Sequence, residues 1–156
     1  IVQDVFPQQI AFNAIPLIGE IQENGYSMEE MKMVWETRKI FEDESIEVNP
    51  TCVRIPVFFG NSEAVHIETK EAISAAQATE LLASASGVEV IDERVDPDFP
   101  TPVRDAAGTD PVFVGRIRKD ISTERGLNLW VVSDNVRKGA ALNSIQIAEV
   151  LIKHLQ

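Results

Sequence analysis

The sequence predicts an α+β fold in which helices pack on one face of a mixed, largely antiparallel sheet. Segments with apolar residues at helical spacing intermingle along the chain with segments in which apolar and polar residues alternate one by one. The first pattern is typical of amphipathic helices and the second of half-buried strands. Elements that intermingle in this way form layers of helices packed on a sheet. Because 156 residues are enough to bury one core, we expect a single domain over residues 1–156.

The first third of the chain is expected to contain one strong helix. Residues 8–22 carry apolar side chains at helical spacing, although Pro16 would kink a regular helix or mark its first turn. Ser27 and Glu30 then form an S-x-x-E capping box, which marks the start of a helix. An apolar stripe follows this box, so we predict an amphipathic helix directly after Ser27.

The rest of the chain is expected to supply the sheet and two further helices. Pro56 lies inside the first predicted strand and favours an edge position or a bulge there. A stretch rich in Pro and Asp, 96–111, is predicted to be a long ordered loop. The remaining alternation and spacing predict strands at 52–59, 64–68, 88–92, 112–118 and 127–133, and helices at 75–85 and about 138–154.

Composition excludes several classes of function. The formal charge of −11 argues against a surface that binds nucleic acid, since neutralising phosphates needs clustered Lys and Arg. One cysteine and two widely spaced histidines give no disulfide and no credible metal site. No apolar run approaches the ~20 residues that span a bilayer, and no secretory signal opens the chain. We therefore expect a cytoplasmic protein without a membrane partner, and the missing initiator Met suggests a fragment.

Charged residues on the first helix are the first candidates for a site. Glu36 and Lys39 are three residues apart, so they share a helix face. They could form a solvated ion pair of little energetic value, or a carboxylate for a substrate ammonium beside a lysine for an anion. Spacing alone leaves both interpretations open.

Arg54 is the second candidate, because it lies in the middle of a predicted apolar strand. An unpaired guanidinium is costly to bury, so Arg54 either pairs with an internal carboxylate or faces a cavity that receives one from a ligand. His66 is interpreted as a structural histidine on a strand and Cys52 as a packing cysteine. The sequence contains no G-x-G-x-x-G motif and no P-loop, so it shows no cradle for a dinucleotide pyrophosphate.

Six segments in order and spacing resemble the aspartate-semialdehyde dehydrogenase family, and together they cover nearly the whole chain. The E-T-x-K and C-V-R-x-P-V pieces within them are the most specific. The segments are IAFNAIP, NGY, EEMKMVWETRKIF, TCVRIPVF, VGRIRKD and LWVVSDNVRKGAALNSIQIAEVL. The chain is thus similar to the carboxy-terminal, substrate-binding and dimerising half of that family, which has a glyceraldehyde-3-phosphate-dehydrogenase-like fold.

The resemblance implies an NADPH-dependent reductive dephosphorylation of L-aspartyl-4-phosphate to aspartate semialdehyde, in the biosynthesis of lysine, threonine and methionine. It also implies a homodimer and an amino-terminal Rossmann domain that binds NADP and supplies a nucleophilic cysteine in an Asn-x-Asn-Cys motif. This sequence contains no such motif. The helix at about 138–154 would pack on that absent domain, and the isolated fragment is expected to be an inactive part of an oxidoreductase.

The resemblance also assigns roles to individual residues. By position, Glu36 matches the residue that binds the substrate amino group, Lys39 the one that binds phosphate, and Arg54 the one that binds the α-carboxylate. Asn143 is the candidate for a cofactor contact. An amino-acid phosphate carries one cationic and two anionic groups. One acidic and two basic side chains would match these groups in charge.

One position departs from the family pattern. The family's acid/base histidine follows a glycine seven residues after the carboxylate-binding arginine, and here that place is Gly60-Asn61. Asn cannot titrate between pH 5 and 8, and His66 lies about 16 Å further along an extended strand, with an offset that favours the other face. Asn61 therefore implies an inactive variant, an altered mechanism or a deliberate substitution.

Two readings compete with the dehydrogenase half. The first is a non-catalytic dimerisation module or inactive paralogue, in which a sheet face pairs with a second copy. The second is half of a related acyl-phosphate reductase such as N-acetylglutamyl-phosphate reductase, which the spacing of the E-T-x-K and C-V-R-x-P pieces disfavours.

Overall fold

A computed structural model describes residues 5–96 and 98–155 of the chain. The chain folds as two compact units, Ile1–Pro56 and Val57–Gln156. The expected single domain over residues 1–156 stays a prediction. The fold class is confirmed, because the second unit is built on a mixed four-stranded sheet with helices.

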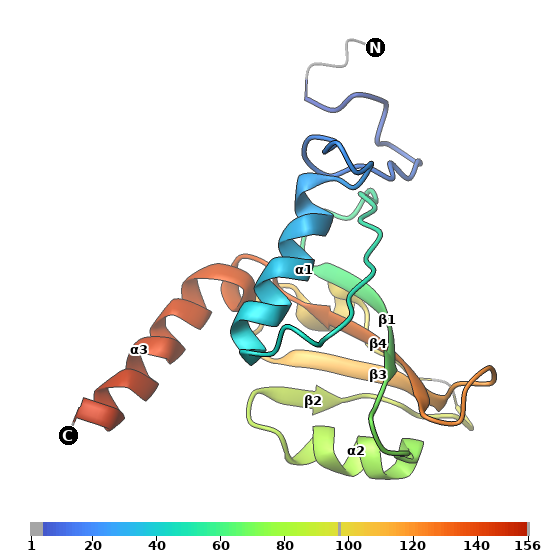
Figure 1. Cartoon of the computed structure of the whole chain (residues 1–156), viewed down its shortest axis with the longest axis vertical. Coiled ribbons are helices and arrows are strands. Elements are labelled where there is room, and N and C mark those ends of the chain that lie inside the picture. The colour runs from blue at the N-terminus through green and yellow to red at the C-terminus, as the bar shows by residue number, and fades with distance from the viewer. Residues whose placement is uncertain (1–4, 97, 156) are drawn as a thin grey trace. The chain divides into compact units, whose positions relative to one another are not determined.

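The first unit is organised around α1 (Met28–Phe41), which begins where the sequence predicts (Figure 1). Ser27 and Glu30 form the predicted capping box: the Ser27 side chain accepts from the Glu30 N–H, and the Glu30 carboxylate accepts from the Ser27 N–H at 2.7 Å. The same carboxylate accepts from the backbone N–H of Cys52 at 2.8 Å. These backbone donors, that of Ser27 first, lower the pKa of Glu30. One buried side chain therefore both caps α1 and anchors a distant loop.

Two segments do not form the regular elements that their local patterns suggest. Residues 8–22 form turns and two isolated bridges instead of a helix, and 52–59 form no strand. The backbone N–H and C=O groups of Ile15 form hydrogen bonds of 2.9 and 2.8 Å with those of Arg54. These groups therefore form a bridge between distant segments and not the hydrogen bonds of a local helix. Pro16 and Pro56 each follow a bridge residue closely and lack a backbone donor, which stops either segment from extending into a regular element.

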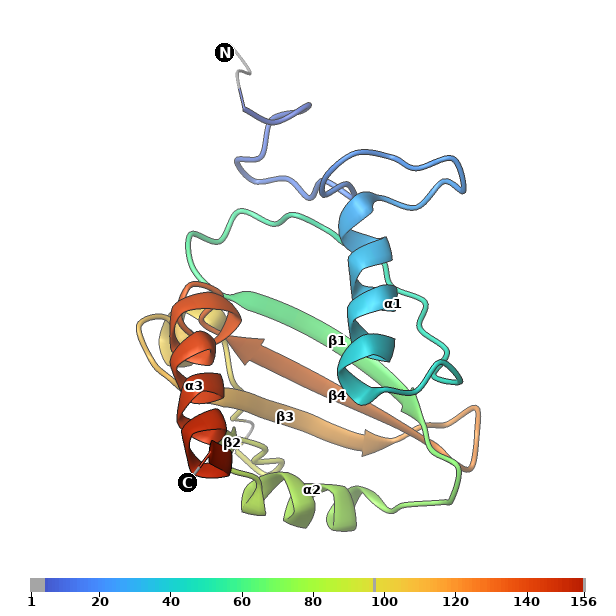
Figure 2. The same ribbon diagram turned by 60° about the vertical axis from the view of Figure 1, so that its left-hand side comes forward.

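The second unit contains the sheet, whose strands are in the order β1-β4-β3-β2 (Figures 1 and 2). They are β1 (Asn61–Glu68), β2 (Val88–Val90), β3 (Val112–Lys119) and β4 (Gly126–Ser133). β4 pairs antiparallel with both β1 and β3, whereas β2 pairs parallel with β3. The predicted strands at 64–68, 88–92, 112–118 and 127–133 thus correspond to the observed ones within a few residues.

Hydrophobic clusters cover both faces of this sheet. On one face, α2 (Ala75–Ser84) places Ala78 against Val114, Ile117 and Leu127. On the opposite face, the π-helical turn η1 (Pro102–Ala106) places its last residue against Phe113 and Val132. Successive residues of β3 point to opposite faces of the sheet. Val114 therefore packs in the cluster under α2, and its neighbour Phe113 packs in the cluster under η1. Within the predicted loop at 96–111, the described residues 98–111 therefore form an ordered cover that includes η1.

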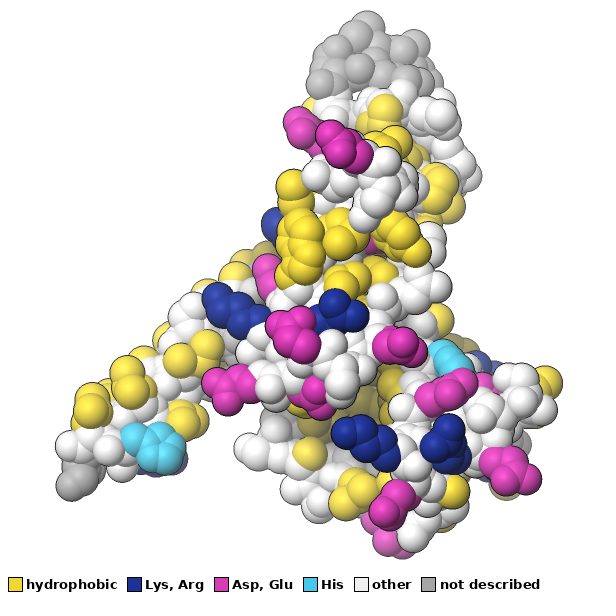
Figure 3. Space-filling model, in the orientation of Figure 1, with side chains coloured by type: hydrophobic (Ala, Val, Ile, Leu, Met, Phe, Trp, Pro, Cys, Tyr) yellow, Lys and Arg dark blue, Asp and Glu magenta, His cyan; other side chains and the backbone are white. Residues whose placement is uncertain are grey.

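The last helix, α3 (Leu142–Leu155), extends away from the sheet in Figure 1. It begins later than the predicted residue 138, because 137–141 form the π-helical turn η2. No residue of α3 is buried. Hydrophobic side chains therefore line an open helix (Figure 3), and those more than half exposed are Ile145, Ile147, Val150, Leu151, Ile152 and Leu155. Within residues 5–96 and 98–155, no helix has the length and apolar character to cross a bilayer.

Candidate functional site

Glu36 and Lys39 lie on the exposed side of α1, one turn apart. Within the part of the chain that the structure describes, no ion pair includes either side chain. By contrast, Lys32 on the same helix pairs with Glu29 at 3.4 Å. The solvated ion pair that spacing allowed is therefore not formed, and both charges of the candidate pair remain available to a ligand.

Arg54 is half-buried in the loop that follows α1, not in a strand. Its backbone forms the bridge with Ile15, and its guanidinium lies 5.0 Å from the centroid of the Phe6 ring. Among the described residues, no carboxylate pairs with it. The first alternative for Arg54, an ion pair with an internal carboxylate, is therefore not found in this part of the chain. The alternative that remains is a carboxylate from a ligand. The stacked arrangement leaves the five N–H donors of the guanidinium edge for a planar anion.

Asn61 is the first residue of β1 and lies opposite Ser133 at the end of β4. It is exposed, and it follows Gly60, which has a φ of +85°. The backbone N–H of Gly60 donates to the side-chain oxygen of Asn135 at 3.0 Å. The chain therefore enters β1 through a left-handed turn that is tied to the segment after β4.

Asn143 lies in the first turn of α3 and is half-buried. Its side-chain oxygen accepts from the Lys138 ammonium at 3.4 Å, and the same ammonium donates to Gln146 at 2.7 Å. Among the described residues, no acceptor is recorded for the Asn143 side-chain NH₂. This amide could donate to a ligand carbonyl, as a nicotinamide contact would require.

The structure places the five predicted residues in two groups. Glu36, Lys39 and Arg54 belong to the first unit, whereas Asn61 and Asn143 belong to the second. Within the second unit, both asparagines are attached to one end of β4: Asn61 pairs with its last residue, and Asn143 follows the turn η2 that continues from it.

His66 lies at the other end of β1 from Asn61, opposite Asn128. Its Nε2 contacts the carboxylate of Asp120, a buried residue just after β3. The N–H and hydroxyl of Ser122 donate to that carboxylate, at 2.6 and 2.8 Å. The Ser122 donors, ahead of His66, hold the pKa of Asp120 at about 2. His66 therefore contacts Asp120 at the end of β1 that is distant from Asn61. This contact agrees with the interpretation of His66 as a structural histidine.

Cys52 packs against Met33, with 3.7 Å between the two sulfur atoms, as expected of a packing cysteine. Among residues 5–96 and 98–155, no cluster of three or more His, Cys, Asp and Glu side chains is arranged to hold a metal ion.

Sequence reasoning missed Asn135, the side chain that holds the turn before Asn61. It follows Asp134, a buried residue whose carboxylate accepts from the N–H groups of Gly108, Val136 and Arg137 at 2.8, 2.9 and 3.0 Å. These donors, that of Gly108 first, lower the pKa of Asp134. A Ser-Asp-Asn run at the end of a strand is a capping signal. It does not reveal that the Asn side chain turns back to another strand.

Comparison with known proteins connects these features to one family. Residues 1–138 match the family described as semialdehyde dehydrogenase, dimerisation domain. The chain is 60% identical over 149 residues to the aspartate-semialdehyde dehydrogenase of Shewanella violacea, covering 96% of this chain and 44% of that protein.

Two solved structures show the same fold. The aspartate semialdehyde dehydrogenase II of Vibrio cholerae complexed with ASA superposes with a TM-score of 0.93 at 58% identity, covering 97% of this chain and 44% of that one. The aspartate semialdehyde dehydrogenase of Candida albicans with NADP gives a TM-score of 0.68 at 28% identity, covering 91% of this chain and 45% of that one. The chain thus spans less than half the length of each of these relatives.

Proposed function

The chain belongs to the semialdehyde dehydrogenase dimerisation-domain family, and from this premise we propose that it is the substrate-binding and dimerising half of an aspartate-semialdehyde dehydrogenase. The reaction would be the NADPH-dependent reductive dephosphorylation of L-aspartyl-4-phosphate to aspartate semialdehyde, a step in the biosynthesis of lysine, threonine and methionine. The partner half would bind the dinucleotide and carry the nucleophilic thiol, and the whole would act in the cytoplasm as a homodimer.

One observation carries this proposal: Glu36, Lys39 and Arg54 of the first unit supply one anion and two cations, and no described ion pair includes any of the three. Aspartyl phosphate presents one ammonium, one carboxylate and one phosphate. We assign the ammonium to Glu36, the phosphate to Lys39 and the α-carboxylate to Arg54. The planar fork of Arg suits bidentate carboxylate binding, and the lysine ammonium is a compact donor for phosphate. Holding both ends of the substrate in this way would orient its acyl carbon for attack.

NADPH, when bound, supplies the hydride that reduces the acyl group. The residue of this chain assigned to the cofactor is Asn143. Its fit rests on the side-chain NH₂, which has no recorded acceptor among the described residues, while Lys138 holds the oxygen of the same side chain. A carboxamide donor fixed in this way could orient a nicotinamide amide without exchanging a proton with it.

The assignment of the two cations is tested in the protein that joins this chain to its dinucleotide-binding half. We expect Lys39→Ala to weaken phosphate binding and Arg54→Ala to weaken aspartate semialdehyde binding, each about 10- to 100-fold, as loss of a charged hydrogen bond predicts. Isothermal titration measures both affinities. Lys32→Ala is the matched control, since Lys32 is also exposed on α1 but pairs with Glu29. Unchanged affinities in both variants would contradict the proposal.

A second candidate function, a dimerisation module without catalysis, is favoured by Asn61. A carboxamide cannot take up and release a proton near neutral pH. If the rest of the machinery is intact, Asn61→His should raise kcat about 100-fold or more, the usual contribution of a general acid/base. Asn61→Gln, which preserves the carboxamide, should not. A dimeric protein that gains no turnover from Asn61→His would instead support the module.

A further inference from the structure

The turn that leads into Asn61 leaves little room for a side chain at position 60. A Cβ added to Gly60 would lie 3.0 Å from the Pro102 Cβ and 3.1 Å from the carbonyl oxygen of Ser133. With its φ of +85°, Gly60 also has a backbone conformation that other residues rarely adopt. The Gly60 backbone therefore packs closely between η1 and the end of β4. This packing restrains the direction in which the chain enters Asn61.

The Asn135 side chain completes this restraint. Its oxygen accepts from the N–H of Gly60 at 3.0 Å, which joins two segments 75 residues apart. The Asn135 side chain is exposed, but its backbone follows the buried Asp134, and that carboxylate is fixed by the N–H groups of Gly108, Val136 and Arg137. The position of the Asn135 oxygen is thus set by a buried network, although the hydrogen bond itself is at the surface.

The same network also reaches α3. Asp134 accepts from Arg137 with its side chain, and its carbonyl oxygen accepts from the N–H of Lys138 at 2.9 Å, in the turn η2 that precedes α3. Lys138 in turn holds the side-chain oxygen of Asn143 at 3.4 Å. The dipeptide Asp134-Asn135 is therefore linked both to the turn before position 61, the place of the family's acid/base histidine, and to Asn143, which the proposed function assigns to the cofactor.

We propose that Asn135 is a positioning residue, which fixes the direction of the side chain at position 61 through the Gly60 N–H. This inference rests on the proposed function, together with the resemblance that makes position 61 the place of the family's acid/base histidine. Asn135 would not touch the substrate. Its contribution would be to keep an acid/base group at position 61 within the narrow range of positions that proton transfer requires.

The experiment uses the protein joined to its dinucleotide-binding half, with Asn61→His as the background. In that background we expect Asn135→Ala to lower kcat about 10- to 100-fold, because an error of about 1 Å in the position of a reacting group has an effect of this size. The KM for phosphate should change by less than about threefold, because phosphate is assigned to Lys39 of the first unit. Asn135→Asp keeps an oxygen that can accept from Gly60 and should recover most of the lost kcat.

Two further variants complete the design. Asn128→Ala is the matched control, since Asn128 lies at the other end of β4, opposite His66, and no hydrogen bond of its side chain is recorded in the described part. Asn135→Gln keeps the carboxamide but moves its oxygen by one methylene, and it replaces Asn135→Ala if that variant does not fold. Rates are taken per folded site, and amide exchange of Gly60 reports loss of the hydrogen bond.

The outcomes separate this inference from the proposed function. If Asn61→His gives no turnover, the proposed function fails, and the inference fails with it. If Asn61→His is active but Asn135→Ala leaves kcat per folded site unchanged while Gly60 exchanges faster, only the inference is overturned. An equal loss in kcat from Asn128→Ala would also overturn it, because the effect would then reflect the sheet as a whole.

Discussion

At the scale of single residues, the structure distinguishes charges that are used within the fold from charges that are open to a ligand. Asp120, Asp134 and Glu30 are buried carboxylates that each accept two or more hydrogen bonds. Their pKa values are lowered for that reason. Glu36 and Lys39 have no such partners among the described residues. This contrast supports ligand roles for the second pair better than their spacing alone does.

Asp120 yields a prediction about acid stability. Its folded-state pKa of about 2 is below the usual 3.8, so its ionised form contributes stability that is present above pH 4 and is lost as the pH falls through 2. Between pH 4 and 2, the wild-type free energy of unfolding should therefore fall more steeply than that of Asp120→Asn. Urea denaturation at a series of pH values measures both.

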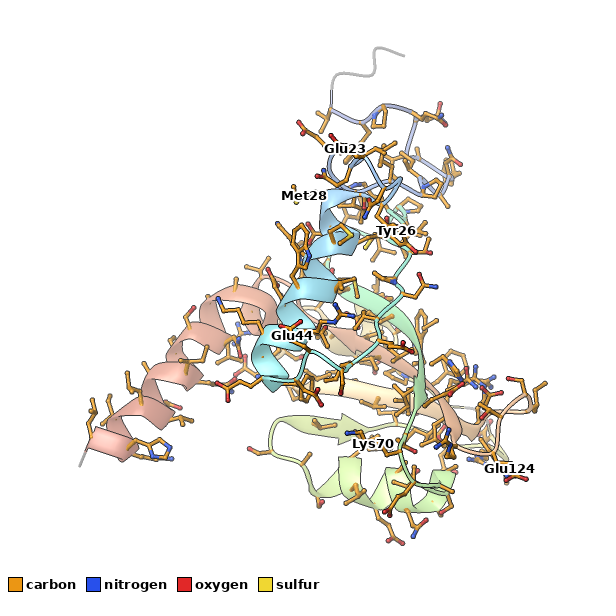
Figure 4. The ribbon with its side chains drawn as sticks, viewed as in Figure 1. Glu23, Tyr26, Met28, Glu44, Lys70 and Glu124 are labelled. Carbon is orange, nitrogen blue, oxygen red and sulfur yellow. The ribbon has the colours of Figure 1, made fainter. Side chains whose placement is uncertain are left out.

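Glu124→Gln is the matched control for Asp120→Asn, because Glu124 is exposed in the same turn between β3 and β4, where Figure 4 labels it. Its pH dependence in this window should follow the wild type. Parallel curves for wild type and Asp120→Asn would show that the donors around Asp120 contribute nothing to acid stability.

At the scale of elements, β3 depends on a close approach that only glycine permits. A Cβ on Gly115 would lie 2.2 Å from the carbonyl oxygen of Ile91 and 2.5 Å from the Pro100 side chain. The next residue, Arg116, has a φ of 55°, and the Asp92 carboxylate accepts from its N–H at 2.8 Å. β3 thus bulges between Gly115 and Arg118 while the segment after β2 crosses it closely.

We therefore predict that Gly115→Ala destabilises the second unit by about 1–3 kcal/mol, the usual cost of overpacking, because the contact is with backbone that cannot easily shift. Gly139→Ala is the control: nothing lies within 4 Å of its added Cβ, and its φ is not positive. That variant should be neutral or up to about 1 kcal/mol more stable. Urea midpoints measure the difference, and equal midpoints for the two variants would contradict the close approach.

At the scale of the whole molecule, α3 is a helix without a buried residue. Its apolar residues lie on an open helix (Figure 3), where a helix that is apolar over much of its surface usually packs against another element. The proposed function supplies one occupant, the dinucleotide-binding half.

We predict that joining that half to the chain slows amide hydrogen exchange in α3 by at least about tenfold, because docking removes local opening of the helix. Exchange in β3, which already lies in the core of the second unit, should stay within about twofold. Mass spectrometry of peptides from 142–155 and 112–119 measures both. Equal exchange of α3 with and without the partner half would show that another surface covers it.

Periodicity and capping signals predicted the elements whose side-chain pattern is regular along the chain. The capping box at Ser27 marks the start of α1, and alternation found all four strands of the sheet. The segments at 8–22 and 52–59 were predicted wrongly, because the bridge between Ile15 and Arg54 overrides their local patterns. No pattern in either segment reveals that the other one is its partner.

The sequence by itself determined the fold class, the family and the identity of the candidate residues, because side-chain spacing, caps and motifs are properties of neighbours along the chain. Only the tertiary structure showed that Glu36, Lys39 and Arg54 have no ion-pair partner in the described part, and that Asn135 holds the turn before Asn61. Both depend on contacts between distant segments. A hydrogen bond across 75 residues forms only after β1 and β4 have paired, so it leaves no local signal in the sequence.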